Sequence, residues 1–440
     1  MSEASDNRID RRGLVACLLI ALVLRGLVIR LHADELTHDR DVYLGMAQGI
    51  AEGRGLCSPG STTPTAFRPP LYPLMLGSLL VAVSAGVAVA FVNGLFGMTT
   101  VWATHRIGRR LGLGRASLIA ALLVAVDPLL LQYTAQPMTE TACAGLVALM
   151  LLAMVSDEWR SPRREWAGGA LFGLLVLCRP TFWPLAGLLA ASWSLNRWRG
   201  SGVASKDDKG SDRSPPSRGL PWRAIVGTLL VVAPWVIRNQ LVLGAPLLTT
   251  THGGYTLLLA NNPVFYDEVV DRPWGTVWGG DSLARWQADQ DERLERDLGP
   301  GASEIARDRR LSAIAREFIA AEPRRFARAV WHRVRSLWSP VPHGDATDGP
   351  ARWLIEAVGW YYSMALLAFA VGMIVIARRP DRGRWWLLFA LVVTVQAVHL
   401  VYWTNARMRA PLTPVIALFA VASLTVRAKP APHDAVDPAG

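Results

Sequence analysis

The chain has 440 residues, of which 51% are hydrophobic and 18% charged, and its formal net charge is +11. A soluble domain carries about 25% charged residues, whereas the apolar residues here stand in blocks of about seventeen or more, as in membrane-spanning helices. These features exclude a soluble enzyme, a secreted disulfide scaffold and a disordered protein. They leave a carrier, a channel or an enzyme that acts on lipid. Nucleic acid is not an expected partner, because the basic runs lack interleaved aromatic residues.

The first apolar block, residues 13–31, follows Arg8, Arg11 and Arg12 and has no small-residue cleavage site after it. We therefore expect an uncleaved anchor whose N-terminus lies in the cytoplasm. Basic clusters recur along the chain, and short basic loops stay in the cytoplasm. Placing every cluster inside predicts nine further spans, at 86–104, 116–134, 139–155, 167–179, 181–196, 223–242, 354–376, 385–403 and 410–426. The sequence thus predicts an all-α polytopic membrane protein with about ten transmembrane helices and two cytoplasmic termini.

Two long polar segments then lie on the outer side. In the first, residues 32–85, the apolar run 71–84 is expected to be a helix on the membrane surface, because a crossing there would place the arginines near 106–115 outside. In the second, residues 244–352, the stretch 317–338 sets aromatic residues against arginines. This pattern predicts either an interfacial amphipathic helix or a helix packed in a small soluble subdomain. The expected divisions are an N-terminal transmembrane module (1–243, with the outer loop 32–85), a large outer loop (244–352), C-terminal transmembrane helices (353–427) and a disordered tail (428–440).

Unusual polar residues collect on the predicted outer side. The acids are Asp34, Glu35, Asp39, Asp41 and Glu140, and the arginines are Arg68, Arg179, Arg238, Arg407 and Arg409. A charge inside the bilayer costs about 2.5–3.5 kcal/mol, so such groups usually face a cavity or a partner. Arginine binds two phosphate oxygens at once and stabilises charge on a departing phosphate, and a carboxylate can take the proton of an acceptor hydroxyl. The pattern therefore predicts glycosyl transfer from a phosphate-linked donor.

Six segments carry a family resemblance by their order and spacing. They are DRDVYLGMAQGIAEGRG (39–55), PTAFRPPLYPLML (64–76), QPMTETACAGL (136–146), LLVLCRPTFWPL (174–185), PWVIRNQLVLGAPLLTTTHGGYTLLLANNP (234–263) and RMRAPLTP (407–414). The sequence resembles the bacterial family-39 glycosyltransferases of the GT-C fold, relatives of protein O-mannosyltransferases and of the aminoarabinose transferase that modifies lipid A. The resemblance implies an inverting enzyme in the inner (plasma) membrane. Its site on the extracytoplasmic face moves a sugar from a polyprenyl-phosphate donor to a glycan, lipid or protein acceptor.

The resemblance also implies roles for single residues. The family's catalytic Asp, four residues before a Tyr, falls on Asp39 before Tyr43; the family often has Glu next, but this chain has Arg40, so Asp41 is a second candidate base. Glu140 matches an acid near the site, and Arg68 matches a basic residue that contacts the lipid phosphate in relatives. Further candidates for substrate binding are Arg179, Arg238, His252, Asn262, Arg407 and Arg409. Helix caps, turns and snorkelling charges are the structural alternatives.

Three alternatives stay open from the sequence. A flippase of lipid-linked glycans would need ionisable residues near the middle of the bilayer and symmetric halves, and a membrane scaffold would leave the gathered charges unexplained. No cofactor is required. A divalent cation is possible, with His32 and His38 beside the acids of the first outer segment, although the spacing of these residues is not diagnostic.

Overall fold

The computed structural model describes residues 3–155, 161–201, 220–341, 343 and 351–425, and the helices found there belong to two groups. The disordered tail expected at 428–440 lies outside the described residues. The bundle helices are α1 (Glu3–Leu31), α4 (Ala85–Arg110), α5 (Ser117–Ala125), α6 (Pro128–Gln132), α7 (Glu140–Met154), α8 (Pro162–Cys178), α9 (Trp183–Ser201), α10 (Trp222–Leu243), α16 (Arg352–Ala377), α17 (Trp386–Val398) and α18 (Thr413–Ala422). The outer helices are α2 (Tyr43–Ala51), α3 (Leu71–Leu80), α11 (Gly253–Leu259), α12 (Pro263–Phe265), α13 (Gly280–Leu298), α14 (Glu304–Ala321) and α15 (Pro323–Leu337).

Helix formation in all ten predicted spans is confirmed, but their lengths differ from the prediction. Within the described residues, α1, α4, α10 and α16 are long and apolar enough to cross a membrane, and a fifth crossing is possible if 114–125 and 128–135, bent by 49°, form one span. By length and composition alone, four or five of the predicted spans therefore pass this test, and the fold is that of an all-α polytopic membrane protein. Helices α7 and α18 are shorter, and they are buried along nearly their whole length. Other helices, not lipid, surround them, so they need not match the bilayer thickness.

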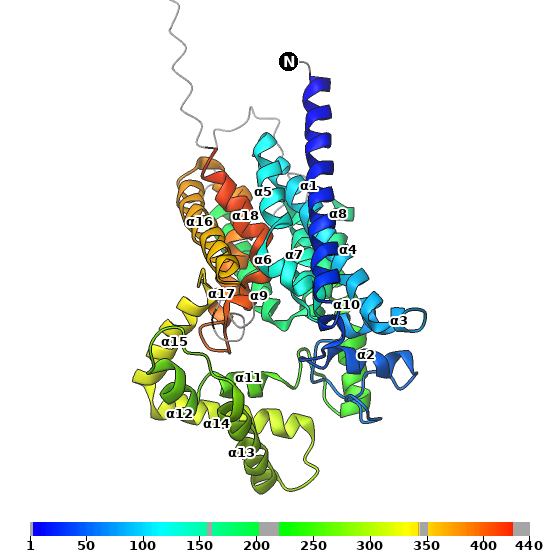
Figure 1. Cartoon of the computed structure of the whole chain (residues 1–440), viewed down its shortest axis with the longest axis vertical. Coiled ribbons are helices and arrows are strands. Elements are labelled where there is room, and N and C mark those ends of the chain that lie inside the picture. The colour runs from blue at the N-terminus through cyan, green and yellow to red at the C-terminus, as the bar shows by residue number, and fades with distance from the viewer. Residues whose placement is uncertain (1–2, 156–160, 202–219, 342, 344–350, 426–440) are drawn as a thin grey trace, which may run out of the picture.

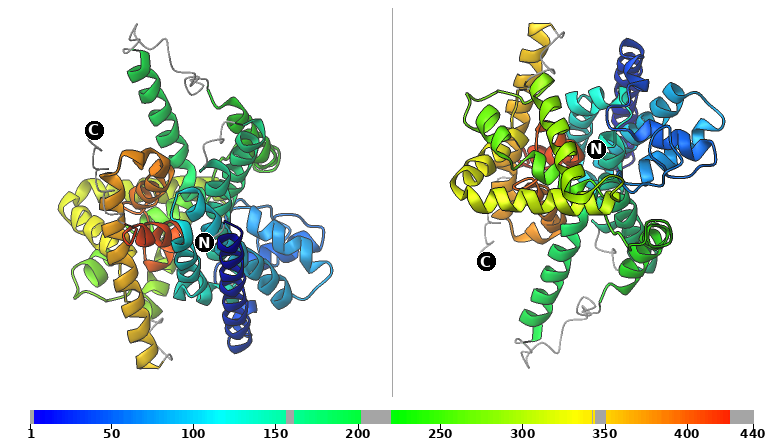
Figure 2. Two further views of the ribbon diagram at one scale, coloured as in Figure 1. Left: turned by 90° about the horizontal axis from the view of Figure 1, so that it is seen from above. Right: turned by 90° about the horizontal axis from the view of Figure 1, so that it is seen from below.

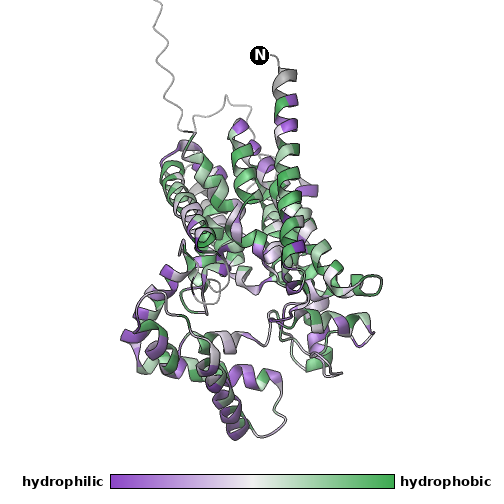
Figure 3. Ribbon diagram, viewed as in Figure 1, coloured by the Kyte–Doolittle hydropathy of each residue, from purple (hydrophilic) through white to green (hydrophobic). Residues whose placement is uncertain are grey.

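The two polar segments lie at the same end of the bundle, as the charge pattern predicts. Figure 1 shows α2 and α3 beside α11–α15 at the end opposite the start of α1. The bundle is mostly apolar, whereas the outer helices mix apolar and polar residues (Figure 3). Seen from below, the helices of the second segment lie across the end of the bundle (Figure 2). Helix α3 has ten residues and is too short to cross a bilayer.

Close backbone contacts join the bundle helices at two glycines. A Cβ atom at Gly169 of α8 would lie 2.0 Å from the carbonyl oxygen of Ala224 on α10, and one at Gly372 of α16 would lie 1.8 Å from the carbonyl oxygen of Phe419 on α18. Only glycine permits such contact, which is a common way for membrane helices to associate.

Between α5 and α6 the helical structure is interrupted inside the bundle, and we call this interruption the break. Pro128 has no N–H group and starts α6, and the Asp127 carboxylate caps that helix by accepting from the Leu130 N–H at 2.9 Å. A break at this depth frees backbone groups that lipid cannot satisfy. Three side chains from other helices bind the freed groups: Tyr361 Oη donates to the Leu123 carbonyl (2.8 Å), Arg25 Nη1 donates to the Ala125 carbonyl (3.3 Å), and Tyr362 Oη accepts from the Leu129 N–H (3.0 Å).

The second outer segment has a small apolar core of its own, built around Phe265, Trp278, Trp286 and Ile314. The single helix expected over 317–338 is divided at Pro323, because α14 ends at Ala321 and α15 begins at Pro323. Proline removes a helical hydrogen bond and is tolerated in the first turn of a new helix. Helix α15 buries one face in this segment, which favours the packed-subdomain alternative, while its Trp331 side chain is 64% exposed.

Candidate functional site

Five charged side chains from distant parts of the sequence meet where the outer segments join the bundle. We call them the outer cluster. They are Asp41 and Arg68 of the first outer segment, Glu140 at the start of α7, Arg179 between α8 and the short 3₁₀ helix η4 (Pro180–Phe182), and Arg407 on the 3₁₀ helix η8 (Ala406–Leu412).

Arginines hold both carboxylate oxygens of Asp41. Arg68 Nη2 lies 3.1 Å from Oδ1, and Arg68 Nε also donates to the Asp41 backbone carbonyl at 2.9 Å. Arg407 Nη1 lies 3.2 Å from Oδ2. Burial acts to raise the pKa of Asp41, but the charges of Arg407 and Arg68 outweigh burial, so that the pKa is lowered. Asp41 is therefore ionised near neutral pH.

Glu140 links the other two arginines. Its side chain is 1% exposed, and Oε1 lies 2.8 Å from Arg179 Nη2 and 3.1 Å from Arg407 Nε. Its second oxygen, Oε2, and Arg179 Nη1 are buried without a hydrogen-bond partner in the described part of the chain. Three arginines and two carboxylates leave the cluster one net positive charge. Because an unpaired buried polar atom costs about 1–3 kcal/mol, the unpaired Arg179 Nη1 donor, together with the net positive charge, favours an anionic ligand.

Local structure explains how Glu140 and Arg179 reach this place. Asn93 of α4 donates from Nδ2 to the carbonyls of Tyr133, Thr134 and Gln136, at 3.2, 3.2 and 2.7 Å, and so fixes the chain just before Glu140. As the first residue of α7, Glu140 also lies at the helix end that favours a negative charge. Pro180 stops α8 and leaves Arg179 in an extended conformation.

The two candidate bases, Asp39 and Asp41, face different partners. Both oxygens of Asp39 accept from α2, at 3.0 Å from the Leu44 N–H and 2.7 Å from the Gly45 N–H. Asp39 thus binds the free N–H groups at a helix start, while Asp41 joins the outer cluster. Val42, between Asp41 and α2, has φ +59°. This left-handed conformation is rare for a β-branched residue.

Aromatic rings line the Arg68 side of the cluster. The Arg68 guanidinium carbon lies 5.5 Å from the centroid of Tyr43 and 5.0 Å from that of Phe67, within cation–π range. His252 packs edge-on against Phe67 at 4.3 Å between centroids. Burial, with the nearby Arg68 charge, lowers the pKa of His252 to about 3. The imidazole is therefore neutral at physiological pH.

Three of the predicted substrate-binding residues also lie outside the cluster and bind backbone instead. Arg238 donates to the carbonyls of Thr65 (2.9 Å) and Leu56 (2.7 Å), which ties the first outer segment to α10. Asn262 caps α12 by accepting from the Phe265 N–H at 2.9 Å. Arg409 is 2% exposed and donates to the carbonyls of Leu337 (2.8 Å) and Ser339 (2.6 Å).

Within the described residues, no group of three or more His, Cys, Asp or Glu side chains is placed to hold a metal ion. His32 Nδ1 lies 3.2 Å from the Val28 carbonyl, and His38 Nδ1 lies 3.7 Å from Glu35 Oε1. The possible cation near these histidines gains no support from the geometry.

The structure adds contacts that the sequence analysis missed. Met138 Sδ lies 3.2 Å from Arg407 Nη1, and Met408 Sδ lies 3.8 Å from Arg179 Nη2. The sequence signal that could have identified these two methionines was their position in the QPMTE and RMRAP motifs. Glu304 of α14 accepts from Thr65 Oγ1 and from the Ala66 N–H, both at 2.7 Å. This contact docks the second outer segment onto the chain that leads to Arg68.

Comparisons with known proteins agree with the family resemblance. Residues 68–201 match the model of the family described as dolichyl-phosphate-mannose-protein mannosyltransferase, which confirms the resemblance over that range. A comparison with curated protein sequences found no match.

Solved structures of two proteins are similar to this chain at low identity. One is the apo oligosaccharyltransferase of Archaeoglobus fulgidus (14% identity, 92% of this chain and 50% of that chain, TM-score 0.49). The other is ArnT of Cupriavidus metallidurans, in the apo state (13%, 90% and 76%, 0.36) and bound to undecaprenyl phosphate (15%, 93% and 77%, 0.41). The chain spans about half the length of the archaeal oligosaccharyltransferase.

Proposed function

We propose that this protein is an integral-membrane inverting glycosyltransferase that moves a sugar from a polyprenyl-phosphate donor to an acceptor on the extracytoplasmic face. The observation that carries the proposal is the outer cluster, with its surplus positive charge and the unpaired Nη1 donor of Arg179. The family model matched by residues 68–201 supports the donor class, since its description names a sugar on a lipid phosphate.

In this proposal the donor phosphate binds Arg68 and Arg407, whose planar guanidinium groups suit phosphate oxygens. Both arginines now hold Asp41. A phosphate that binds there competes with the Asp41 carboxylate for both arginines and weakens their ion pairs with it. The bound donor thereby makes Asp41 a stronger base at the moment when a base is needed.

The freed Asp41 carboxylate then takes the proton of the acceptor hydroxyl. The hydroxyl oxygen forms a bond to the anomeric carbon as the bond from that carbon to the phosphate oxygen breaks, and the electron pair leaves with polyprenyl phosphate. Attack from the face opposite the phosphate inverts the anomeric carbon. Arg68 and Arg407 stabilise the charge that develops on the phosphate. Asp39, which the family resemblance implies, is the alternative base.

Glu140 and Arg179, the other two members of the outer cluster, support this arrangement. The Glu140 carboxylate pairs by charge with Arg407, with Oε1 3.1 Å from Nε, while Arg407 Nη1 binds Asp41. The unpaired Arg179 Nη1 is a further donor for a phosphate or sugar oxygen. The neutral His252 and the rings of Tyr43 and Phe67 suit the uncharged sugar.

The membrane orientation rests on charge. The outer segments lie at the end of the bundle opposite the start of α1, whose first turns contain Arg8, Arg11 and Arg12 (Figure 1). Since basic residues stay on the cytoplasmic side, the outer cluster faces the extracytoplasmic side, in the inner membrane of a bacterial cell.

The experiment is a transfer assay on the full chain, purified in detergent and offered a panel of polyprenyl-phosphate sugars with cell-envelope acceptors. Mass spectrometry measures free polyprenyl phosphate and the glycosylated product. We expect release by the wild type and none by Arg407→Gln. Translocation of the intact lipid-linked sugar across vesicles without release would instead establish the flippase alternative and overturn the proposal.

A further inference from the structure

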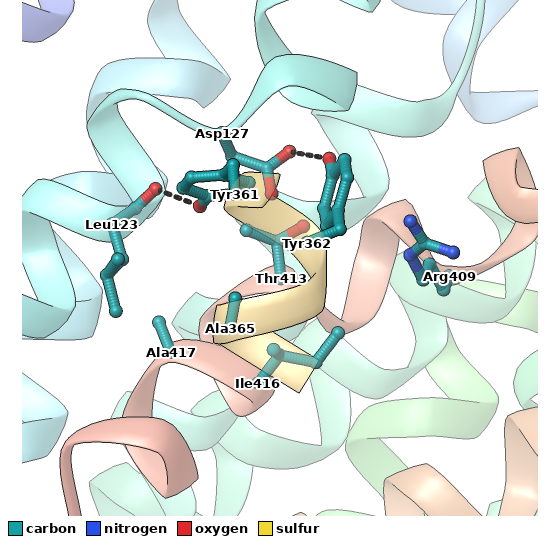
Figure 4. Close-up of a pocket in the computed structure, with 9 residues that line it drawn as sticks. All are labelled: Leu123, Asp127, Tyr361, Tyr362, Ala365, Arg409, Thr413, Ile416 and Ala417. Carbon is teal, nitrogen blue, oxygen red and sulfur yellow. Dashed lines mark hydrogen bonds between the residues drawn. The ribbon is translucent and has the colours of Figure 1, made fainter. Parts of the chain in front are cut away.

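We infer that Asp127, Tyr362 and Arg409 form a clamp inside the bundle that sets the position of Arg407, and hence the affinity for the donor phosphate. This inference rests on the proposed function. These three residues lie apart from the outer cluster, and they line a small cavity among α5, α16 and α18 (Figure 4). We treat them as positioning residues, because none of them contacts the outer cluster directly.

The clamp begins at Arg409, on the same short helix as Arg407. Its Nη1 atom donates to two carbonyls at the end of α15, those of Leu337 and Ser339. Its guanidinium carbon lies 4.4 Å from the centroid of the Tyr362 ring. One buried side chain thus ties η8 to the second outer segment and to α16.

Tyr362 connects η8 to the break between α5 and α6. Its hydroxyl donates to Asp127 Oδ1 at 3.2 Å and accepts from the Leu129 N–H at 3.0 Å. Asp127 is itself fixed as the cap of α6. The ring of Tyr362 therefore has one orientation, and the plane on which Arg409 rests is fixed with it.

The geometry of η8 makes this placement matter for Arg407. The helix runs from Ala406 to Leu412 and contains Pro411, so Arg407 and Arg409 stand on one short rigid element. Arg407 must reach Asp41 and Glu140 at once, at 3.2 and 3.1 Å. A displacement of about 1 Å in such a constellation can cost about 100-fold in function. Loosening Arg409 would move Arg407 away from one of its partners.

The neighbouring Tyr361 supplies a matched control. Its hydroxyl also binds a group freed by the break, donating to the Leu123 carbonyl at 2.8 Å, and it lines the same cavity. Of these two tyrosines, Tyr362 has an arginine over its ring, and no such contact is found for Tyr361 among the described residues. If these tyrosines served the break alone, removing either hydroxyl would have similar consequences.

The test measures the binding of farnesyl phosphate, a short polyprenyl phosphate, to the full chain in detergent, together with the KM and kcat of transfer. We expect Tyr362→Phe to raise the Kd and the KM for the donor about tenfold with a smaller change in kcat, and Tyr361→Phe to change them less than about twofold. Arg409→Lys, which keeps the charge but loses the planar group on the ring, should behave like Tyr362→Phe. It serves as the second variant if Tyr362→Phe does not fold.

A double-mutant cycle decides whether Tyr362 acts through Arg407. In an Arg407→Gln background, Tyr362→Phe should have no further effect on the residual Kd. Additive effects, or equal effects of the two tyrosine variants, would overturn the clamp while leaving the proposed function intact. If the wild type neither binds farnesyl phosphate nor transfers sugar, the proposed function fails and the clamp proposal fails with it.

Discussion

The outer cluster and the break between α5 and α6 both bury arginines beside an aspartate, yet the arginines bind different kinds of partner. In the outer cluster, Arg68, Arg179 and Arg407 pair chiefly with the carboxylates of Asp41 and Glu140. Near the break, Arg25 donates to the Ala125 carbonyl, and Arg409 donates to the Leu337 and Ser339 carbonyls at the end of α15.

This difference distinguishes arginines that can exchange their partner for a ligand from arginines that only support the fold. A side-chain carboxylate can rotate away when a phosphate arrives, so an arginine that binds one is available to a ligand. A backbone carbonyl at a helix end cannot leave, and a membrane offers it no water in exchange. Variants in the outer cluster should therefore change transfer, whereas a variant of a residue that only satisfies the break, such as Arg25, should first change stability.

The largest effect should come from Arg407, the residue that touches both acids of the outer cluster. Arg407→Gln should lower kcat/KM about 1,000-fold, because it removes a donor that stabilises the charge developing on the phosphate. Arg238→Gln is the matched control, since Arg238 binds only backbone and its neighbour Asn239. Comparable losses of kcat/KM in the two variants would contradict the distinction between arginines that exchange their partner for a ligand and arginines that only support the fold.

The next largest effect should be a difference in activity loss between variants of Asp41 and of Asp39. Asp41→Asn should lower kcat at least about 100-fold with little change in stability, because it removes the proposed base. Asp39→Asn should cost about 1 kcal/mol of stability, because the amide has one acceptor oxygen and leaves either the Leu44 or the Gly45 N–H without its partner. It should leave most of the activity per folded molecule. Transfer rates and thermal unfolding of both proteins provide the comparison. The reverse order of activity loss would make Asp39 the base.

At the break, Arg25→Ala should act on stability. It leaves the Ala125 carbonyl without a donor and opens a void beside Gly97, for a cost of about 2 kcal/mol. Transfer per folded molecule should stay at the wild-type level. Val23→Ala, on the exposed face of the same helix, should change the unfolding midpoint little. A loss of transfer without a loss of stability in Arg25→Ala would contradict this interpretation of the break.

The smallest expected effect concerns acidity at the edge of the cluster. The pKa of His252 is about 3 in the folded chain and 6.5 in its ordinary state. Below pH 6.5 the unfolded chain therefore binds a proton that the folded chain does not, and stability falls as the pH falls. The contribution is about 1 kcal/mol near pH 5 for this half-buried side chain. His252→Gln should flatten the pH dependence of the unfolding midpoint between pH 4 and 6.5; an unchanged slope would assign that dependence to other groups.

Much of the fold could be predicted because the bilayer imposes simple rules. Apolar blocks gave the helices, and the basic loops gave an alternation that places both polar segments at one end. Helix lengths could not be predicted in the same way. An apolar run such as 410–426 looks the same whether it faces lipid or other helices, and α18 proves to be enclosed. The division of 317–338 at Pro323 was visible in the sequence but outweighed by the aromatic spacing.

The candidate site could be predicted in composition but not in pairing. Asp41, Arg68, Glu140, Arg179 and Arg407 were all among the predicted residues. Their contacts depend on long-range packing that one sequence does not contain. Arg238 and Arg409 look like Arg179 and Arg407 in the sequence, since each stands near a helix end on the outer side. Only the structure shows that the first pair binds backbone and that the second pair binds carboxylates.

The unusual backbone of Val42 has a consequence for how the two aspartates can change. Asp39 and Asp41 are two residues apart, and in an extended strand their side chains would point to the same side. The left-handed turn at Val42 leads the chain directly into α2, with Asp39 at the helix start and Asp41 among the arginines. A glycine at position 42 would adopt this shape without strain, and it would also permit many others. The branched side chain thus restricts the backbone of the loop to a conformation in which Asp39 caps α2 and Asp41 pairs with Arg68 and Arg407.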